Sequence, residues 1–357
     1  MTAVFQANGL ATLIGSLPLV DHNEALDLIW AHMPEIPMWA QLPSNRREGM
    51  MVQFASGLPG LCHANDSLFV DAGGDAFDRE LLEFYEDYLA VIEGRLQLDA
   101  SRFALTEDTA QGFFTLAKRL QTAANIPAAV KGQITGPFTF CTGIADQEKR
   151  AIFYDPQIRD AAVKLLALKA RWQAERLAEF QRPVIIFVDE PGLAGFGSSE
   201  FTSIAREEVM QCLEDVFEPV HQAGGLIGVH VCANTDWSLV LDSAADFVSF
   251  DAYGYFDRFI LYPDQLRAFL DAGKFLAWGL VPTLNADDLE KETAASLVRR
   301  FEEQVKQVAA LGIDPRQLIK QSLITPACGA GTLSIDLAKK VLRVTREISE
   351  EIRKRYF

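Results

Sequence analysis

The sequence lacks any long apolar run and any obvious targeting segment. None of its 357 residues falls in a stretch approaching the roughly 20 consecutive apolar residues that a membrane-spanning helix needs. The start of the chain, Met1 to Phe5, has neither the basic segment nor the apolar stretch of a signal peptide. We therefore expect a cytoplasmic protein that has no membrane partner.

Basic residues are scarce relative to acidic ones. The chain has 33 Lys and Arg against 49 Asp and Glu, a formal net charge of −16. Nucleic acids and anionic membranes bind clustered cations, whereas the basic residues here alternate with acids, as in the stretch from Arg346 to Glu351. This pattern is typical of solvated helix faces, and it argues against a nucleic-acid partner.

Cysteine is also rare. The five cysteines are Cys62, Cys141, Cys212, Cys232 and Cys328. An odd and sparse set in a chain without a secretion signal argues for a reducing compartment and against a disulfide framework. The sequence also has no G-x-G-x-x-G after its first expected strand, which weakens a dinucleotide-binding hypothesis.

Apolar stretches alternate with helical patterns along the whole chain. Continuous rather than alternating apolar strands favour a parallel sheet buried on both faces. We predict an α/β fold, a single-domain (β/α)8 TIM barrel over 1–357, with an inserted loop and helical excursion around 43–125. The alternative is an open doubly wound sheet, since periodicity does not prove closure. The expected strands are 11–17, 36–42, 128–134, 183–188, 225–231, 246–251, 274–281 and 319–325.

The stretch from Val229 to Thr235 organises the candidate site. His230 and Cys232 are two residues apart in a strand, so their side chains point to the same side, and Cys328 follows the last expected strand. Imidazole and thiolate are zinc ligands, and a three-residue set leaves one coordination position open for substrate. The alternative is a core histidine with two inert buried cysteines.

Further polar residues fall at strand ends, where barrel enzymes place their active sites. Asp189 and Glu190 end a very apolar strand and need solvent, a ligand amine or a salt bridge at the rim. Gly15 and Ser16 offer a backbone turn and a hydroxyl that suit a carboxylate. Asp251 is a fourth zinc ligand, an acceptor for a ligand N–H, or an ordinary aspartate at a strand end.

Taken together, these motifs resemble a known family. Their order is similar to that in the C-terminal barrel of cobalamin-independent methionine synthase, of the superfamily that includes uroporphyrinogen decarboxylase and the zinc methyltransferases acting on coenzyme M. The resemblance covers nearly the whole chain. It rests on five motifs: Ile14-Gly15-Ser16-Leu17-Pro18, Thr135-Gly136-Pro137, Asp189-Glu190-Pro191, His230-Val231-Cys232 and Pro326-Ala327-Cys328-Gly329.

The resemblance implies a zinc centre. His230, Cys232 and Cys328 match the family's zinc ligands. The family's fourth ligand is a glutamate at the end of the next strand, and Asp251 is the nearest match here. The resemblance therefore implies Zn²⁺ as the cofactor, with Asp251 as a ligand and as one of two catalytic carboxylates.

The resemblance also implies an amino-acid subsite. Ile14, Gly15 and Ser16 match the groups that hold the substrate carboxylate. Asp189, the other expected catalytic carboxylate, matches the acid that takes the amino group. Glu48 matches another amine-binding acid. The implied activity is S-methyl transfer to a thiol, namely homocysteine, giving methionine.

Two departures from the family concern the methyl donor. The sequence contains no second, N-terminal barrel, and Phe138 to Thr142 has no tryptophan after the Thr-Gly-Pro motif. Both features serve methyltetrahydrofolate in the full-length synthase. We therefore expect a stand-alone core form that takes methyl from a methylcorrinoid, either free or bound to a corrinoid protein.

Two alternative functions stay open. The first is a uroporphyrinogen decarboxylase-like enzyme on a tetrapyrrole, which would need arginines at the barrel mouth; Arg46 and Arg47 are the one adjacent pair in a candidate loop. The second is a non-catalytic corrinoid- or zinc-binding partner protein, which would bind ligand without turnover.

Overall fold

A parallel β-sheet forms the centre of the computed structural model, which describes residues 5–64, 67–199 and 201–357. Its six strands pair in chain order. They are nearly all buried, which accounts for their continuous apolar sequence. The strands are β3 (Val130–Thr135), β5 (Val184–Asp189), β6 (Leu226–Val231), β7 (Phe247–Phe250), β8 (Phe275–Val281) and β9 (Ser322–Pro326).

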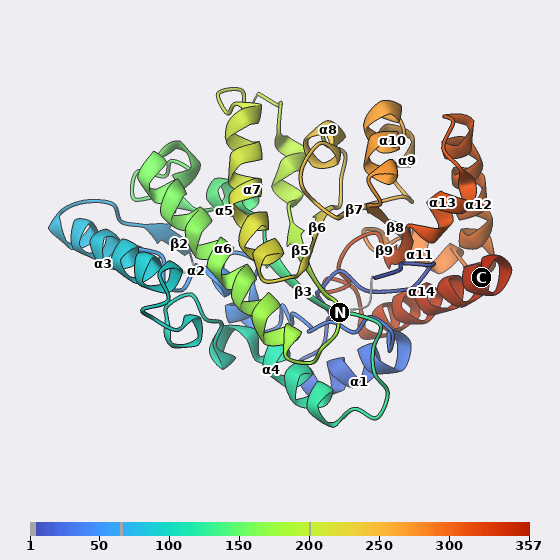
Figure 1. Cartoon of the computed structure of the whole chain (residues 1–357), viewed down its shortest axis with the longest axis horizontal. Coiled ribbons are helices and arrows are strands. Elements are labelled where there is room, and N and C mark those ends of the chain that lie inside the picture. The colour runs from blue at the N-terminus through green and yellow to red at the C-terminus, as the bar shows by residue number, and fades with distance from the viewer. Residues whose placement is uncertain (1–4, 65–66, 200) are drawn as a thin grey trace.

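Helices connect these strands and lie outside the sheet (Figure 1). The α/β class and the six predicted strands between 128 and 325 are therefore confirmed. Among the described residues, no helix combines the length and the apolar character that crossing a membrane requires. The helices of this half are α6 (Pro156–Ala178), η4 (Pro191–Gly195), α7 (Arg206–Gln222), α8 (Trp237–Leu241), α9 (Phe256–Phe259), α10 (Pro263–Asp271), α11 (Ala286–Lys291), α12 (Ala294–Ala310), α13 (Pro315–Lys320) and α14 (Ile335–Tyr356).

Two irregular segments connect the edge strands β3 and β9. The predicted strands 11–17 and 36–42 are present only as isolated parallel bridges, because Pro37 and Pro43 have no N–H to donate and Pro18 ends the first segment. The structure thus shows a curled six-stranded sheet, and a complete eight-stranded barrel stays a prediction. The bridges are Ala11–Ile324, Ser16–Gln41 and Met38–Lys131.

An apolar cluster fills the sheet at the N-terminal ends of its strands. The Phe5 ring packs edge-on against Phe247 and Phe275, with centroids 5.6 and 5.4 Å apart. Ile185 of β5 and Leu323 of β9 belong to the same cluster. Since strands that are not neighbours share it, the sheet must curl around it. The apolar packing leaves the opposite, C-terminal ends of the strands for polar groups.

The excursion predicted over 43–125 contains two long helices, as expected, and two strands of a small sheet that was not expected. In that sheet β2 pairs with both β1 and β4, and β4 lies outside the excursion. Its strands have four residues or fewer, too short to leave a periodic pattern. The elements of the first half are α1 (His22–His32), η1 (Arg46–Glu48), α2 (Val52–Ala55), β1 (Leu61–Ala64), β2 (Ser67–Val70), α3 (Asp75–Ile92), η2 (Leu98–Ala100), α4 (Glu107–Thr122), α5 (Pro137–Gly143), β4 (Ala145–Asp146) and η3 (Ile152–Tyr154).

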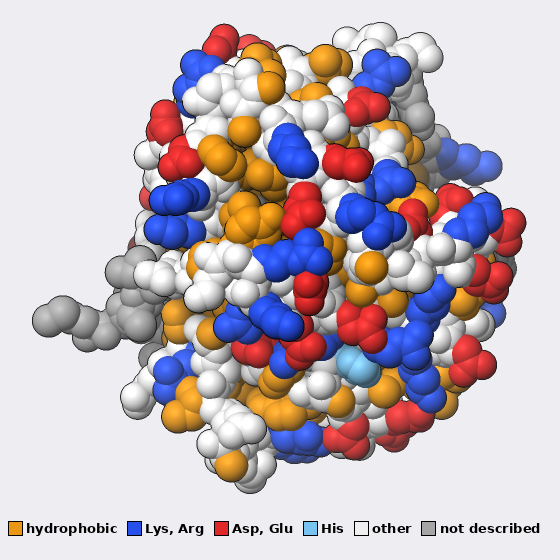
Figure 2. All heavy atoms as spheres, turned by 90° about the vertical axis from the view of Figure 1, so that its right-hand side faces the viewer, with side chains coloured by type: hydrophobic (Ala, Val, Ile, Leu, Met, Phe, Trp, Pro, Cys, Tyr) orange, Lys and Arg blue, Asp and Glu red, His pale blue; other side chains and the backbone are white. Residues whose placement is uncertain are grey.

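Charges of both signs are interspersed on the outer helices. Figure 2, which turns the right-hand side of Figure 1 towards the viewer, shows cationic and anionic side chains mixed across this face. On α14, Arg346 pairs with Glu350 at 2.5 Å and Arg355 pairs with Glu302 at 2.7 Å. The mixed charges of this helix are therefore solvated ion pairs, as the sequence pattern indicates.

Candidate active site

A cavity of about 240 Å³ lies at the C-terminal ends of the strands. Of the residues predicted for the site, Glu190 and Asp251 do not line it. A larger cavity of about 490 Å³ lies between the Tyr253–Asp257 loop and α12, but no Cys or His lines it. The smaller cavity is lined by Ile14, Gly15, Ser16, Gln41, Pro43, Glu48, Gly49, Met50, Asp189, Pro191, His230, Cys232, Cys328 and Gly329.

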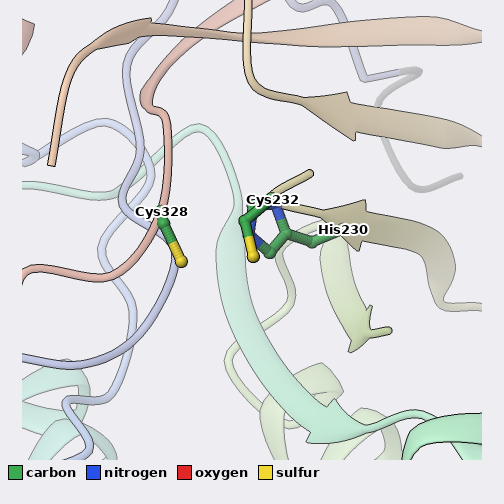
Figure 3. A group of neighbouring side chains, drawn as sticks. All are labelled: His230, Cys232 and Cys328. Carbon is green, nitrogen blue, oxygen red and sulfur yellow. The ribbon is translucent and has the colours of Figure 1, made fainter. Parts of the chain in front are cut away.

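Three possible metal ligands meet in this cavity. His230 lies on β6, Cys232 directly follows that strand, and Cys328 follows β9. Their ligand atoms all lie within 4.8 Å of one another. Figure 3 shows the Cys328 sulfur, from a separate segment, pointing towards the His230 and Cys232 side chains. The fold thus unites residues almost 100 positions apart in the sequence into a group that could hold a metal ion.

The His230 ring is oriented for this purpose. The ring is 2% exposed, and its Nδ1 lies 3.0 Å from the Ser249 hydroxyl oxygen, on the residue paired with it in β7. Its Nε2 is buried and has no hydrogen-bond partner among the described residues. A ring held at Nδ1, with Nε2 left without a partner, is the arrangement that metal-ligating histidines adopt. The residues present therefore fit a metal.

The two cysteines influence each other's ionisation. A hydrogen bond from the Cys328 thiol lowers the pKa of Cys232 against the opposing effect of burial. The same bond, together with burial, raises the pKa of Cys328. The pair therefore holds one thiolate readily and resists a second negative charge. A divalent cation would favour both thiolates, and Zn²⁺ accepts this nitrogen and sulfur donor set.

The side chains of the adjacent residues Asp189 and Glu190 lie in different places, one at the cavity and the other at the start of α5. Asp189 is 6% exposed and lines the cavity, and its Oδ1 is buried without a partner among the described residues. Burial raises the pKa of its carboxyl. Glu190 accepts hydrogen bonds from the N–H groups of Phe138 and Thr139, at 2.9 and 2.8 Å, and from the Thr139 hydroxyl at 2.5 Å. Asp189 is thus available to a ligand, whereas Glu190 caps α5.

The segment from Ile14 to Ser16 presents unused backbone donors. The Gly15 carbonyl accepts a 3.1 Å hydrogen bond from Gln41, and the Ser16 carbonyl accepts a 2.9 Å bond from Ala330. No described residue accepts a hydrogen bond from the N–H of Gly15 or Ser16. The segment is therefore fixed through its carbonyl oxygens, while its N–H groups stay free for an anion.

Two predicted residues are held by the protein itself. The buried Glu48 carboxylate lies 2.8 Å from His22 Nε2 and accepts a 2.8 Å hydrogen bond from the Leu42 N–H. Asp251 Oδ1 accepts bonds from the N–H groups of Tyr253 and Gly254, at 2.9 and 2.7 Å. Glu48 lines the cavity, whereas Asp251 lies outside the group of three ligands. Amine binding by Glu48 and zinc ligation by Asp251 stay predictions.

The sequence analysis missed two polar residues around the site. They are Ser249, which holds His230, and Lys131, which donates a 2.5 Å hydrogen bond to the Ile14 carbonyl. Ser249 interrupts an otherwise apolar strand, and Lys131 is a charged residue in the buried strand β3, which was the available signal. Their partners became evident only from the strand register.

Comparisons with known proteins do not identify a function for this chain, so a functional assignment depends on the geometry of the site. No protein-family model matches the chain, and no curated protein matches it. Among solved structures, the chain is similar to a B12-independent methionine synthase from Shewanella sp. W3-18-1 in complex with selenomethionine. The match has 19% identity and a TM-score of 0.47, and it covers 69% of this chain. The chain spans 66% of that structure, slightly less than two thirds, and a likeness this distant carries no functional argument.

Proposed function

We propose that this chain is a zinc-dependent methyltransferase that methylates the thiol of homocysteine to give methionine. One observation carries the proposal. The buried Nε2 of His230 has no partner among the described residues, and this residue lies with Cys232 and Cys328 in a cavity of about 240 Å³. A His-Cys-Cys set is a three-ligand zinc site with a position left for substrate. The proposal includes one complete barrel over residues 1–357.

The other free groups of the cavity suit an α-amino acid. Asp189 has an unpartnered carboxylate oxygen that an ammonium group would satisfy. The N–H groups of Gly15 and Ser16 would bind a carboxylate. The cavity is also smaller than the roughly 300–1,000 Å³ of sites for drug-sized ligands. A small amino-acid thiol therefore meets the available hydrogen-bonding groups and the available space.

The chemistry divides between the metal and the chain. A zinc ion held by His230, Cys232 and Cys328 would lower the pKa of a substrate thiol and so favour the thiolate at neutral pH. Asp189 and the Gly15–Ser16 backbone would fix the rest of the substrate, which lowers the entropic part of the barrier. The new bond joins sulfur to the methyl carbon, the bond from methyl to donor breaks, and the thiol proton leaves to solvent.

The proposed methyl donor is a methylcorrinoid. A corrinoid is much larger than an amino acid, so a cavity of about 240 Å³ would not enclose it together with the thiol. The donor would instead present its methyl group at the cavity opening. This argument applies to any large donor, so the choice between a corrinoid and methyltetrahydrofolate depends on assay.

The tetrapyrrole decarboxylase alternative is less well supported. Such an enzyme needs cationic side chains for the substrate carboxylates, and no Arg or Lys of the described part of the chain lines the cavity. Arg46 and Arg47 are exposed on η1, and Arg47 lies 3.7 Å from Asp108. The His-Cys-Cys group would also have no role in that reaction.

The test first measures the zinc content of the chain and then the formation of methionine. We expect about one zinc per purified chain by elemental analysis, and loss of zinc in the variants His230→Ala and Cys328→Ser. The matched control Cys62→Ser changes a cysteine on β1, outside the group, and should retain zinc. The zinc-loaded chain is then incubated with L-homocysteine and either methylcobalamin or methyltetrahydrofolate, and methionine is measured by chromatography.

Three results would contradict the proposal. The first is a chain that neither contains nor takes up zinc. The second is zinc that remains bound in Cys328→Ser. The third is a zinc-loaded chain that binds homocysteine but forms no methionine with either donor, which would favour the non-catalytic binding protein.

A further inference from the structure

Lys131 is a lysine buried inside the curled sheet, where an apolar residue would be expected. It lies on β3 and is 0% exposed. Its Nζ donates a 2.5 Å hydrogen bond to the Ile14 carbonyl, lies 3.5 Å from Gln133 Oε1, and lies 4.5 Å from the centre of the Phe187 ring. Burial of an ammonium group is costly unless it has specific partners. The partners of Lys131 should therefore indicate why it is there.

Its hydrogen-bond partner belongs to the candidate amino-acid subsite. The Ile14 carbonyl directly precedes the two unused N–H groups of Gly15 and Ser16. The Ile14 carbonyl accepts a hydrogen bond from Lys131 and the Gly15 carbonyl accepts one from Gln41, so the segment is held through both carbonyl groups. The ammonium also places a positive charge behind the donors that would receive a substrate carboxylate.

We propose that Lys131 is a positioning residue that holds the carboxylate half of an α-amino-acid subsite, through its hydrogen bond to the Ile14 carbonyl. It thereby favours thiols that carry a carboxylate group. This inference rests on the proposed function. Lys131 itself contacts neither the cysteines nor His230 by any hydrogen bond in the described part of the chain.

A second buried lysine provides the matched control. Lys169 lies on α6, is 2% exposed, and has a pKa that burial lowers to about 8. It does not line the cavity. If burial of a lysine served only the fold, Lys131 and Lys169 would respond alike to replacement by methionine.

The experiment is calorimetric titration of the zinc-loaded chain with three thiols. L-Homocysteine carries both charged groups, 3-mercaptopropylamine lacks the carboxylate, and 4-mercaptobutanoate lacks the ammonium. We expect Lys131→Met to weaken the binding of the two carboxylate-bearing thiols, homocysteine and 4-mercaptobutanoate, by about 10- to 100-fold, with little effect on 3-mercaptopropylamine and none on zinc content. Lys169→Met should retain the wild-type preference for homocysteine.

A second variant covers the case in which Lys131→Met does not fold. Lys131→Gln keeps a donor for the Ile14 carbonyl and removes the charge. It should weaken the two carboxylate-bearing thiols by about 3- to 10-fold, less than Lys131→Met does, and leave the binding of 3-mercaptopropylamine unchanged. A preference for carboxylate-bearing thiols within about twofold of wild type in either folded Lys131 variant would overturn the inference. Equal weakening of all three thiols would also overturn it, in favour of a structural role. If the wild-type, zinc-loaded chain does not bind homocysteine, the proposed function itself fails.

Discussion

Replacement of Glu190 by alanine should destabilise the fold by an amount that depends on pH. The carboxylate caps α5 by accepting bonds from the buried N–H groups of Phe138 and Thr139. Each buried donor left unsatisfied costs roughly 1–3 kcal/mol, so the loss of two predicts a decrease of about 2–6 kcal/mol in the free energy of unfolding. The Thr139 hydroxyl is free to rotate to another acceptor, so it adds little.

The pH dependence follows from the pKa of the same group. Burial raises the pKa of Glu190 from 4.5 to about 7, although the hydrogen bonds from Thr139 and Phe138 oppose it. Between these values the folded state binds more protons than the unfolded state, so the stability contributed by Glu190 falls as pH rises. The full difference corresponds to about 3 kcal/mol. The deficit of the alanine variant should therefore be largest near pH 5 and should shrink towards pH 8.

Urea unfolding of the metal-free chain, followed by circular dichroism at pH 5 and pH 8, measures both effects. Glu83→Ala serves as the control, because Glu83 is exposed on α3 and its loss should change stability by no more than about 0.5 kcal/mol. A loss below about 1 kcal/mol at pH 5 for Glu190→Ala would refute the capping role. A deficit that grows from pH 5 to pH 8 would refute the assignment of the raised pKa.

Two further predictions concern residues that support the site. Ser249→Ala removes the partner of His230 Nδ1, so zinc affinity should fall by about 10- to 100-fold in competition with a chromophoric chelator. The control Ser243→Ala changes a buried serine that does not line the cavity, and it should leave zinc affinity unchanged. Equal zinc affinities in the two variants would count against the orienting role of Ser249. Gly136→Ala would place a new methyl group 2.2 Å from the Glu190 side chain, so the midpoint of thermal unfolding should fall sharply, whereas Gly73→Ala, whose nearest neighbour would be 3.2 Å away, should be tolerated.

The sequence predicts the central strands well because parallel strands buried on both faces leave continuous apolar runs. It also places His230, Cys232 and Cys328 near one another, since all three lie at C-terminal strand ends. It fails at segments 11–17 and 36–42, where prolines interrupt pairing and only isolated bridges form. Periodicity reports burial, but it does not report which backbone hydrogen bonds are made.

Adjacent or isolated polar residues are harder to interpret from sequence. Asp189 and Glu190 are equivalent in the sequence, yet one lines the cavity and the other caps α5. Which acid faces inward depends on strand register. The contact of Lys131 with the site could not be predicted for the same reason, because its partner Ile14 lies 117 residues away in the chain.

The pairing of Ala11 with Ile324 also has a consequence for biosynthesis. The first of the two segments has its partner in the last strand of the sheet, so all residues between Ala11 and Ile324 must be synthesised before the two can meet. Cys328 follows that strand, and a nascent chain that ends earlier has only two of the three proposed ligands. If the site holds zinc, tight uptake of the metal would begin only after β9 has joined the sheet.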